Sequence, residues 1–150
     1  MVDNLKSKLT VIRIDYASTE YAHTLELRNR VLRLPLGLKL TPQETAADKN
    51  DFLFACTLNN KVIGCFILTP INSHIVKMRQ VAVDTDQQKL GVGRTMSEFA
   101  EAWAKNHHYS YIELHARKAV EGFYKKLGYQ PSGDIFIEVG IAHIKMKKQL

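Results

Sequence analysis

The stretch DTDQQKLGVGRTMSEFA, residues 84–100, joins two segments of different character. The apolar run MRQVAV before it is typical of a strand, whereas Met96, Phe99, Ala100 and Trp103 recur at the spacing of an amphipathic helix. A glycine-containing turn at the start of a helix presents unpaired backbone N–H groups at the positive end of the helix dipole. The stretch therefore predicts a strand, an anion-binding turn and a helix.

The local sequence leaves one alternative open, in which Gly91 and Gly93 serve only the geometry of the turn. Two other phosphate-binding motifs fit poorly. A Walker loop requires Gly-Lys-Ser/Thr, which is absent, and the dinucleotide fingerprint requires a third glycine where Met96 stands.

The remaining chain predicts an α+β fold. Apolar runs indicate strands at residues 9–15, 52–58, 62–71, 75–83, 109–116, 130–136 and 138–147. Helical spacing indicates helices at 21–32, shortly after Thr41, from Gly93 to near Asn106, and at 119–127, with Ser18 and Thr41 as caps. One helix separates strands four and five, which predicts a parallel βαβ unit. We expect a single domain over residues 1–150, with a mixed, largely antiparallel sheet of about seven strands and four helices.

Composition limits the class of protein. A chain of 150 residues that is 45% hydrophobic and 24% charged can bury the core of one globular domain. The formal net charge of +6 suits an anionic partner, but the basic residues are spread along the chain, and no nucleic-acid-binding motif is found. No apolar run reaches the roughly 20 residues that span a bilayer, and the N-terminus lacks signal-peptide features. We expect a cytoplasmic protein without nucleic-acid or membrane partners.

The two cysteines, Cys56 and Cys65, fall in runs joined by the hairpin signal NNK. The register that this turn predicts places Cys56 opposite Ile63, with Cys65 as a diagonal neighbour on the same face. Their β-carbons would then lie about 7 Å apart, whereas a disulfide requires about 4 Å. We predict two buried free thiols.

Two segments resemble the GNAT superfamily of N-acetyltransferases. VAVDTDQQKLGVGRTM resembles its acyl-CoA-binding signature, Gln/Arg-x-x-Gly-x-Gly/Ala, with Gln88, Gly91 and Gly93 in register. FYKKLGY, residues 123–129, resembles the next signature, whose tyrosine falls on Tyr124. IELHARKAVEGFYKKLGY and EVGIAHIKMKK are similar to the small bacterial ElaA-like branch, although Ala142 stands where that branch often has proline. The asparagine that many GNATs place ahead of the tyrosine helix is missing.

The resemblance implies the GNAT fold and acetyl-CoA as cosubstrate. By position, the backbones of Val81 and Val83 would bind the pantetheine arm, and a backbone N–H near Val83 would stabilise the oxyanion. The residues implied for the pyrophosphate are Gln88, Leu90, Gly91, Val92, Gly93, Arg94 and Thr95.

Tyr124 is implied to face the sulfur and to stabilise the departing thiolate by a hydrogen bond, with complete proton transfer as an option. His143 and Glu138, both placed on the final strand, are the candidates for the general base, with His115 as a third. Histidine titrates near neutral pH, as a base requires, but a histidine in a strand is often structural. The helix arginines Arg28, Arg30 and Arg33 could reach an acidic acceptor, although a solvated face is favoured.

The resulting hypothesis is an acetyl-CoA-dependent N-acyltransferase that moves an acetyl group by direct transfer to a primary amine of a small molecule or protein. A non-catalytic acyl-CoA-binding sensor or assembly module is the alternative. The sequence has no zinc-ligand spacing or hydrolase motif, and we expect no metal. The acceptor and the oligomeric state stay open, although the final strand could pair with its copy in a homodimer.

Overall fold

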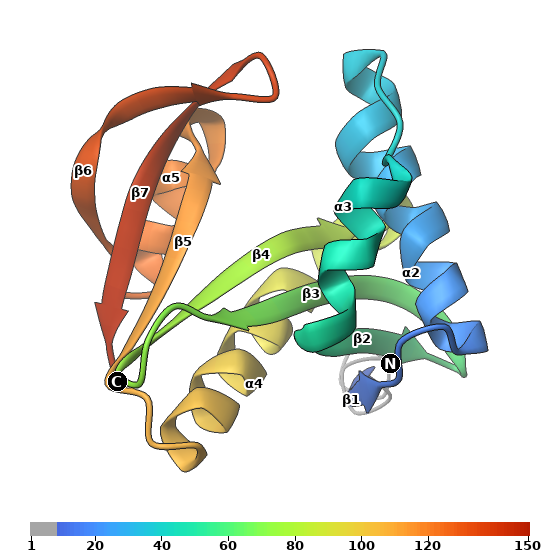
Figure 1. The fold of residues 1–150 in the computed structure, drawn as a ribbon, viewed down its shortest axis with the longest axis horizontal. Helices are drawn as coiled ribbons and strands as arrows, with labels where there is room; N and C mark the ends of the chain where they lie inside the picture. Colours follow the sequence, from blue (N-terminus) through green and yellow to red (C-terminus); the bar gives the residue numbers. More distant parts are fainter. Residues whose placement is uncertain (1–8) are drawn as a thin grey trace.

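The computed structural model describes residues 9–150 and contains one sheet with helices on both faces (Figure 1). The α-helices are α2 (Thr19–Arg28), α3 (Pro42–Ala46), α4 (Val92–Asn106) and α5 (Glu121–Lys126). The strands are β1 (Leu9–Ile14), β2 (Phe52–Leu58), β3 (Lys61–Pro70), β4 (Ile75–Val83), β5 (Tyr111–Arg117), β6 (Gln130–Glu138) and β7 (Ile141–Gln149).

The sheet order is β1-β2-β3-β4-β5-β7-β6, and all neighbours are antiparallel except β4 and β5. Within residues 9–150 this confirms the predicted α+β fold, with its seven-stranded mixed sheet, one parallel pair and four α-helices.

Alternation along the strands assigns each helix to a face of the sheet. In β1, Leu9 and Val11 contact the main core beneath α4, whereas Ile14 belongs to the cluster beneath α2. The main core includes Met96 and Ala100 of α4, which lie on the apolar stripe that the sequence predicted. Burying each large apolar side chain stabilises the fold by about 1.5–3 kcal/mol.

The predicted helix caps are confirmed. The Ser18 hydroxyl oxygen accepts the Tyr21 N–H at 3.1 Å at the start of α2. Thr41 and Glu44 form a reciprocal capping box at the start of α3, with distances of 3.2 Å and 2.7 Å. Each cap satisfies backbone N–H groups that have no partner inside the helix.

The first predicted helix, 21–32, is not one continuous α-helix. α2 ends at Arg28, and a π-helical turn, Asn29–Arg33, follows, in which the Leu34 N–H donates to the Asn29 carbonyl. The Asn29 side chain is held by the Leu40 N–H at 2.7 Å, and Pro35, which has no N–H, lies in a short 3₁₀ turn beyond. Such wide turns are frequent at functional sites, and this one borders the cavity described below.

Two predictions about the last strands are wrong. The turn falls at Val139 and Gly140, which both have positive φ angles of 48° and 80°, so Glu138 ends β6 and does not lie on the final strand. A β-branched residue rarely adopts such a conformation, and Val139 therefore gave no turn signal. In addition, β7 is paired on both sides, with β5 and with β6, and it cannot add to a sheet in a second copy.

The cysteines are free and buried, as predicted, but the predicted register is wrong. A bulge at Ile63 pairs Cys56 with Gly64 and Cys65 with Ala55, which places the two thiols on opposite faces of the sheet. Burial raises the pKa of Cys56 to about 11 and that of Cys65 to about 12.

None of the helices in the described part of the chain combines the length and apolar character needed to cross a bilayer.

Candidate active site

β4 and β5 separate along their length and open a cavity between them. They pair only from Ile75 with Tyr111 to Met78 with Leu114, and their C-terminal parts diverge (Figure 1). The cavity has a volume of about 560 Å³ and is lined by β4, β5, the π-helical turn, the start of α4, α5 and the β6–β7 turn. This volume lies in the range of small-molecule sites.

A β-bulge shapes the β4 side of the cavity. Cys65 pairs with Ala82 and Ile67 pairs with Arg79, so Gln80 and Val81 lie opposite a single residue of β3. Gln80 has a φ of 53°, which is rare for a residue other than glycine, and its side-chain oxygen accepts the Arg28 Nε–H at 3.1 Å. Bulges are common beside active sites because they redirect the strand. The sequence did not predict the bulge at Gln80 and Val81, because no glycine marks it.

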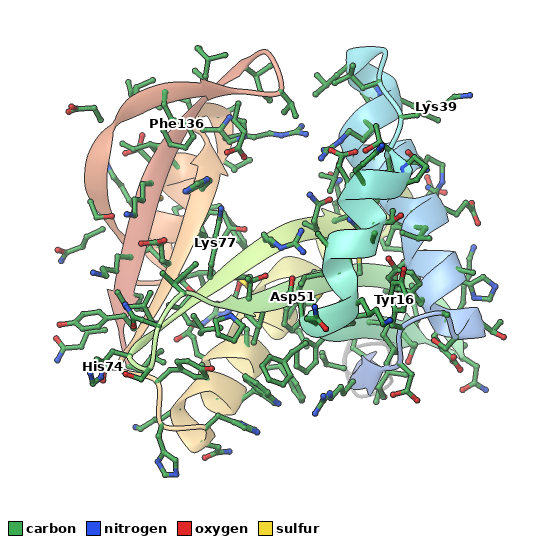
Figure 2. The ribbon with its side chains drawn as sticks, in the orientation of Figure 1. Tyr16, Lys39, Asp51, His74, Lys77 and Phe136 are labelled. Atoms are coloured by element: carbon green, nitrogen blue, oxygen red, sulfur yellow. The ribbon has the colours of Figure 1, made fainter. Side chains whose placement is uncertain are left out.

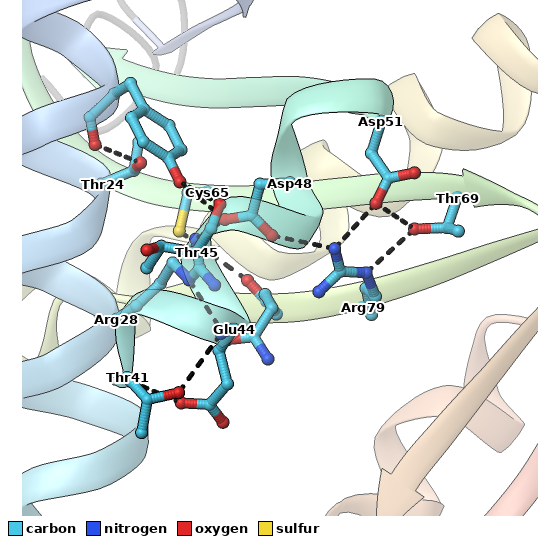
Figure 3. Close-up of polar contacts among 12 residues, drawn as sticks. Thr24, Arg28, Thr41, Glu44, Thr45, Asp48, Asp51, Cys65, Thr69 and Arg79 are labelled. Carbon is cyan, nitrogen blue, oxygen red and sulfur yellow. Dashed lines mark hydrogen bonds and ion pairs between the residues drawn. The ribbon is translucent and has the colours of Figure 1, made fainter. Parts of the chain in front are cut away.

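A buried ionic network supports the bulge (Figure 3). Asp48 is fully buried and accepts hydrogen bonds from Arg28 Nη1 at 2.7 Å, Arg79 Nη2 at 2.9 Å and the Tyr21 hydroxyl at 2.8 Å. Arg79 also donates to Asp51 at 2.7 Å. The network therefore fixes Gln80 in two ways. Arg28, which Asp48 holds, binds the Gln80 side chain, and Arg79, which Asp48 also holds, is the preceding residue in β4.

The sequence favoured a solvent-exposed helix face for Arg28, Arg30 and Arg33, and this prediction is wrong for two of the three. Arg28 is 1% exposed and Arg33 is 8% exposed. Arg30 is the partly exposed one, and it pairs with Asp84 at 3.3 Å. Arg30 also lies 3.7 Å from Glu26, one helical turn away, but the hydrogen-bond partners of the three arginines lie 11 to 54 residues away in sequence, so helical spacing could not predict the burial.

The glycine turn forms one end of the cavity. Gly91 has a φ of 73°, and α4 begins after it without a side-chain cap. The Thr95 N–H makes the first helical bond, to the Gly91 carbonyl at 2.9 Å. The N–H groups of Val92, Gly93 and Arg94 therefore have no partner within the helix. This is the geometry of an anion-binding helix start.

The cavity gathers most of the predicted site residues and leaves out three of them. Its walls include Val81, Val83, Gln88, Gly91, Gly93, Arg94, Tyr124, Glu138 and His143. Val92 is fully buried in the core, Leu90 packs against that core, and the Thr95 N–H is used within α4. A β-carbon at Gly93 would lie 3.2 Å from the Phe123 ring, so a glycine there permits close packing of α4 and α5.

Tyr124 of α5 lies on the cavity wall with its ring buried to 7% exposure. Its ring packs edge-on against Phe123 and Tyr129, with centroids 5.1 Å and 5.6 Å away. Burial raises the pKa of Tyr124 to about 12. The hydroxyl therefore keeps its proton at neutral pH and can act as a hydrogen-bond donor.

His143 of β7 also lines the cavity and is 4% exposed. Its Nδ1 lies 2.9 Å from the Ile141 carbonyl oxygen. A carbonyl can only accept, so Nδ1 carries the hydrogen of the neutral ring and Nε2 keeps a free lone pair. Phe136 stacks on the ring at 5.8 Å. The arrangement leaves one basic nitrogen on a ring of fixed tautomer.

Glu138 lies beside His115, the third candidate base. Its Oε2 is 3.1 Å from His115 Nδ1, and Lys77 Nζ is 3.2 Å from the same nitrogen. One ring nitrogen cannot donate to Glu138 and accept from Lys77 at once, so the tautomer of His115 decides which bond forms. Burial lowers the pKa of Lys77. The Phe136 ring packs edge-on against the His115 ring, with centroids 4.9 Å apart, and Lys77 and Phe136 are both labelled in Figure 2.

Residues 39–150 match the sequence profile described as the acetyltransferase (GNAT) domain. The chain belongs to the GNAT acetyltransferase family. A candidate acetyltransferase from Bacillus subtilis is 32% identical over 79 residues, which are 53% of this GNAT chain and 54% of the relative. The chain thus spans about half the length of the curated relatives it matches.

Solved structures confirm the GNAT fold. A candidate N-acetyltransferase from Lactobacillus plantarum superposes with a TM-score of 0.85 at 22% identity, covering 95% of this chain and 98% of that one. ElaA from Escherichia coli gives 0.77 at 18% identity, with 93% and 99% covered, which supports the expected likeness to ElaA. A GNAT family acetyltransferase from Elizabethkingia anophelis with acetyl-CoA bound gives 0.74 at 18% identity, with 95% and 99% covered.

Within residues 9–150, no three His, Cys, Asp or Glu side chains come close enough together to hold a metal ion.

Proposed function

We propose that residues 1–150 act as one GNAT domain that transfers an acetyl group from acetyl-CoA directly to a primary amine. One observation carries the proposal. A single cavity of about 560 Å³ connects the uncapped start of α4, the bulged edge of β4 and the buried hydroxyl-bearing ring of Tyr124. An anion site, an open strand edge and a hydrogen-bond donor are what a phosphate-bearing thioester requires.

The chain has groups suited to each part of acetyl-CoA. The free N–H groups at Gly93 and Arg94, with Gly91 and Gln88 beside them, suit the pyrophosphate. Val81 and Val83 lie on β4 beyond its last pair with β5, so backbone groups on that edge are open to the pantetheine amides. Leu90, Val92 and Thr95 would act by anchoring the turn and the helix start to the core.

Tyr124 would stabilise the departing thiolate. Acetyl-CoA, when bound, supplies the thioester whose carbonyl an amine attacks. Burial raises the pKa of Tyr124 to about 12, and a phenol is a weaker acid than a thiol, so complete proton transfer from the phenol to the thiolate is unfavourable. We therefore assign Tyr124 a hydrogen bond to the sulfur, and a β4 backbone N–H near Val83 the developing oxyanion.

His143 would accept the proton of the amine. Its Nε2 is the free nitrogen of a ring on the cavity wall, which is the arrangement that a general base needs. Glu138 would act through His115, whose Nδ1–H it can accept, and is then a positioning residue for a second basic nitrogen.

The test is release of free CoA, followed with a thiol reagent, from acetyl-CoA and a panel of primary amines. The proposal predicts release above the rate without enzyme for at least one amine, with the acetylated amine found by mass spectrometry. A protein that binds acetyl-CoA but releases no CoA with any amine would instead be the non-catalytic sensor or assembly module.

A further inference from the structure

The cavity wall carries an excess of positive charge. Among the described residues that line it, Glu138 is the one carboxylate. The cations on the same wall are Arg33, Lys77, Arg79, Arg94 and Arg117. Such a surface attracts anionic ligands and disfavours polycationic amines.

Three of these cations are paired with carboxylates of the protein itself, and the first is Arg33, which contacts Glu44 at 3.3 Å. Arg79 contacts Asp48 at 2.9 Å and Asp51 at 2.7 Å, and Arg94 contacts Glu98 at 3.0 Å on the outer surface of α4. Their charges are therefore largely satisfied before any ligand binds.

Within residues 9–150, neither Lys77 nor Arg117 has a carboxylate within 4 Å, but Lys77 Nζ lies 3.2 Å from His115 Nδ1, whereas Arg117 has no side-chain hydrogen-bond partner there. Its Nη2 donates to the Leu32 carbonyl at 3.2 Å, so the side chain reaches from the end of β5 to the π-helical turn. A guanidinium has five N–H donors, and most of them stay available. Burial and the nearby positive charge of Arg33 lower the pKa of Arg117, as expected for a cation without a counter-ion.

Arg117 lies directly opposite His143 in the pairing of β5 with β7. Side chains of such a pair share a face of the sheet, with β-carbons about 5 Å apart. A ligand placed between them could offer an amine to His143 and an anion to Arg117. Both side chains line the cavity, and an α-amino acid carries an amine and a carboxylate on one small molecule that could meet both.

We propose that the acceptor is a carboxylate-bearing amine of the α-amino acid type and that Arg117 binds its carboxylate. This inference rests on the proposed acetyl transfer. The amine nitrogen forms an amide bond with the acetyl carbon, and the carbon–sulfur bond of the thioester breaks. The nitrogen's proton goes to His143, which releases it to solvent, and the departing thiolate takes a proton from solvent to become CoA thiol. The carboxylate is unchanged.

The test compares matched acceptors, each amino acid of a standard panel against its own carboxamide. The amide keeps the amine and the side chain but removes the negative charge. We expect kcat/KM of at least one amino acid to exceed that of its amide by tenfold or more. In Arg117→Gln this preference should fall to near one, and Arg117→Lys should keep part of it because the charge remains without the planar fork.

Lys145→Gln is the matched control, since Lys145 is a cation on the same face of the sheet that pairs with Glu113 at 3.0 Å outside the cavity. It should leave the preference unchanged, and circular dichroism should show every variant folded. Equal use of acids and amides by the wild-type protein would overturn the inference alone. So would an Arg117→Gln variant whose KM for acetyl-CoA rises while the preference stays. Absence of turnover with every acceptor would remove the proposed function and this inference together.

Discussion

At the scale of single residues, Tyr124 shows most clearly how burial changes chemistry. A phenol in water is already a weaker acid than a thiol, and burial raises the pKa of Tyr124 further, to about 12. The family resemblance identified Tyr124 by its position in the signature. Its raised pKa depends on burial, to which the packed rings of Phe123 and Tyr129 contribute.

Tyr124→Phe removes only the hydroxyl and keeps the edge-on aromatic packing. We expect turnover to fall at least tenfold, because the departing thiolate loses its donor, with the affinity for acetyl-CoA little changed. Steady-state kinetics and calorimetry measure the two quantities. An unchanged rate would end the role proposed for the hydroxyl.

His143→Ala tests the proposed base. Removing a positioned base typically costs a factor of about 10² to 10⁴. If His143 accepts the proton of the amine, the shape of the pH–rate profile should change in the variant. A pH–rate profile that keeps its shape in His143→Ala would shift the assignment to His115, for which Glu138→Gln is the corresponding variant.

At the scale of elements, local signals predicted starts of helices well and irregular backbone poorly. The caps Ser18 and Thr41 act within three residues of their partners, so their patterns are visible in sequence. The bulge at Gln80 depends on Arg28, which is 52 residues away, and has no glycine to announce it. The turn at Val139 likewise uses a residue type that avoids positive φ.

Asp48 supports the β4 side of the cavity, because it binds Arg28 and Arg79, the two arginines that hold the bulge at Gln80. Asp48→Asn would leave the buried Arg28 guanidinium with an uncompensated charge, whereas Arg79 would keep its ion pair with Asp51. Breaking a buried ion pair in this way costs about 3–5 kcal/mol. Urea denaturation should show this loss. Asp134→Asn, at an exposed position of β6, is the control and should stay within about 0.5 kcal/mol of wild type. A comparable stability for both variants would show that the network does not support the fold.

At the scale of the whole molecule, the order of elements was predictable and the composition of the cavity only in part. Nine predicted site residues meet on the cavity wall. Seven of them belong to the signatures at 81–96 and 123–129, which lie at or after the ends of the two strands that diverge, and Glu138 and His143 come from β6 and β7. Arg33, Lys77 and Arg117 reach the same wall from three separate elements. Their convergence follows from strand register and the π-helical turn, which no local pattern encodes.

Binding of acetyl-CoA should stabilise the whole fold. A ligand at a hundred times its Kd adds about 2.7 kcal/mol to the free energy of unfolding. For a chain of 150 residues this corresponds to a rise in Tm of about 5–10 °C. Differential scanning calorimetry with and without acetyl-CoA measures the shift, and a Tm that does not move at any concentration would contradict it.

The most direct test of the account is isothermal titration of the protein with acetyl-CoA, alongside Gly91→Glu and Gly91→Gln. A β-carbon at Gly91 meets no atom within 4 Å, and both variants carry the same strain from its φ of 73°, so they differ only in charge. We predict micromolar binding by the wild type and at least tenfold weaker binding by Gly91→Glu than by Gly91→Gln. A folded wild type that does not bind acetyl-CoA, or two variants that bind it equally, would contradict a coenzyme A site at this turn.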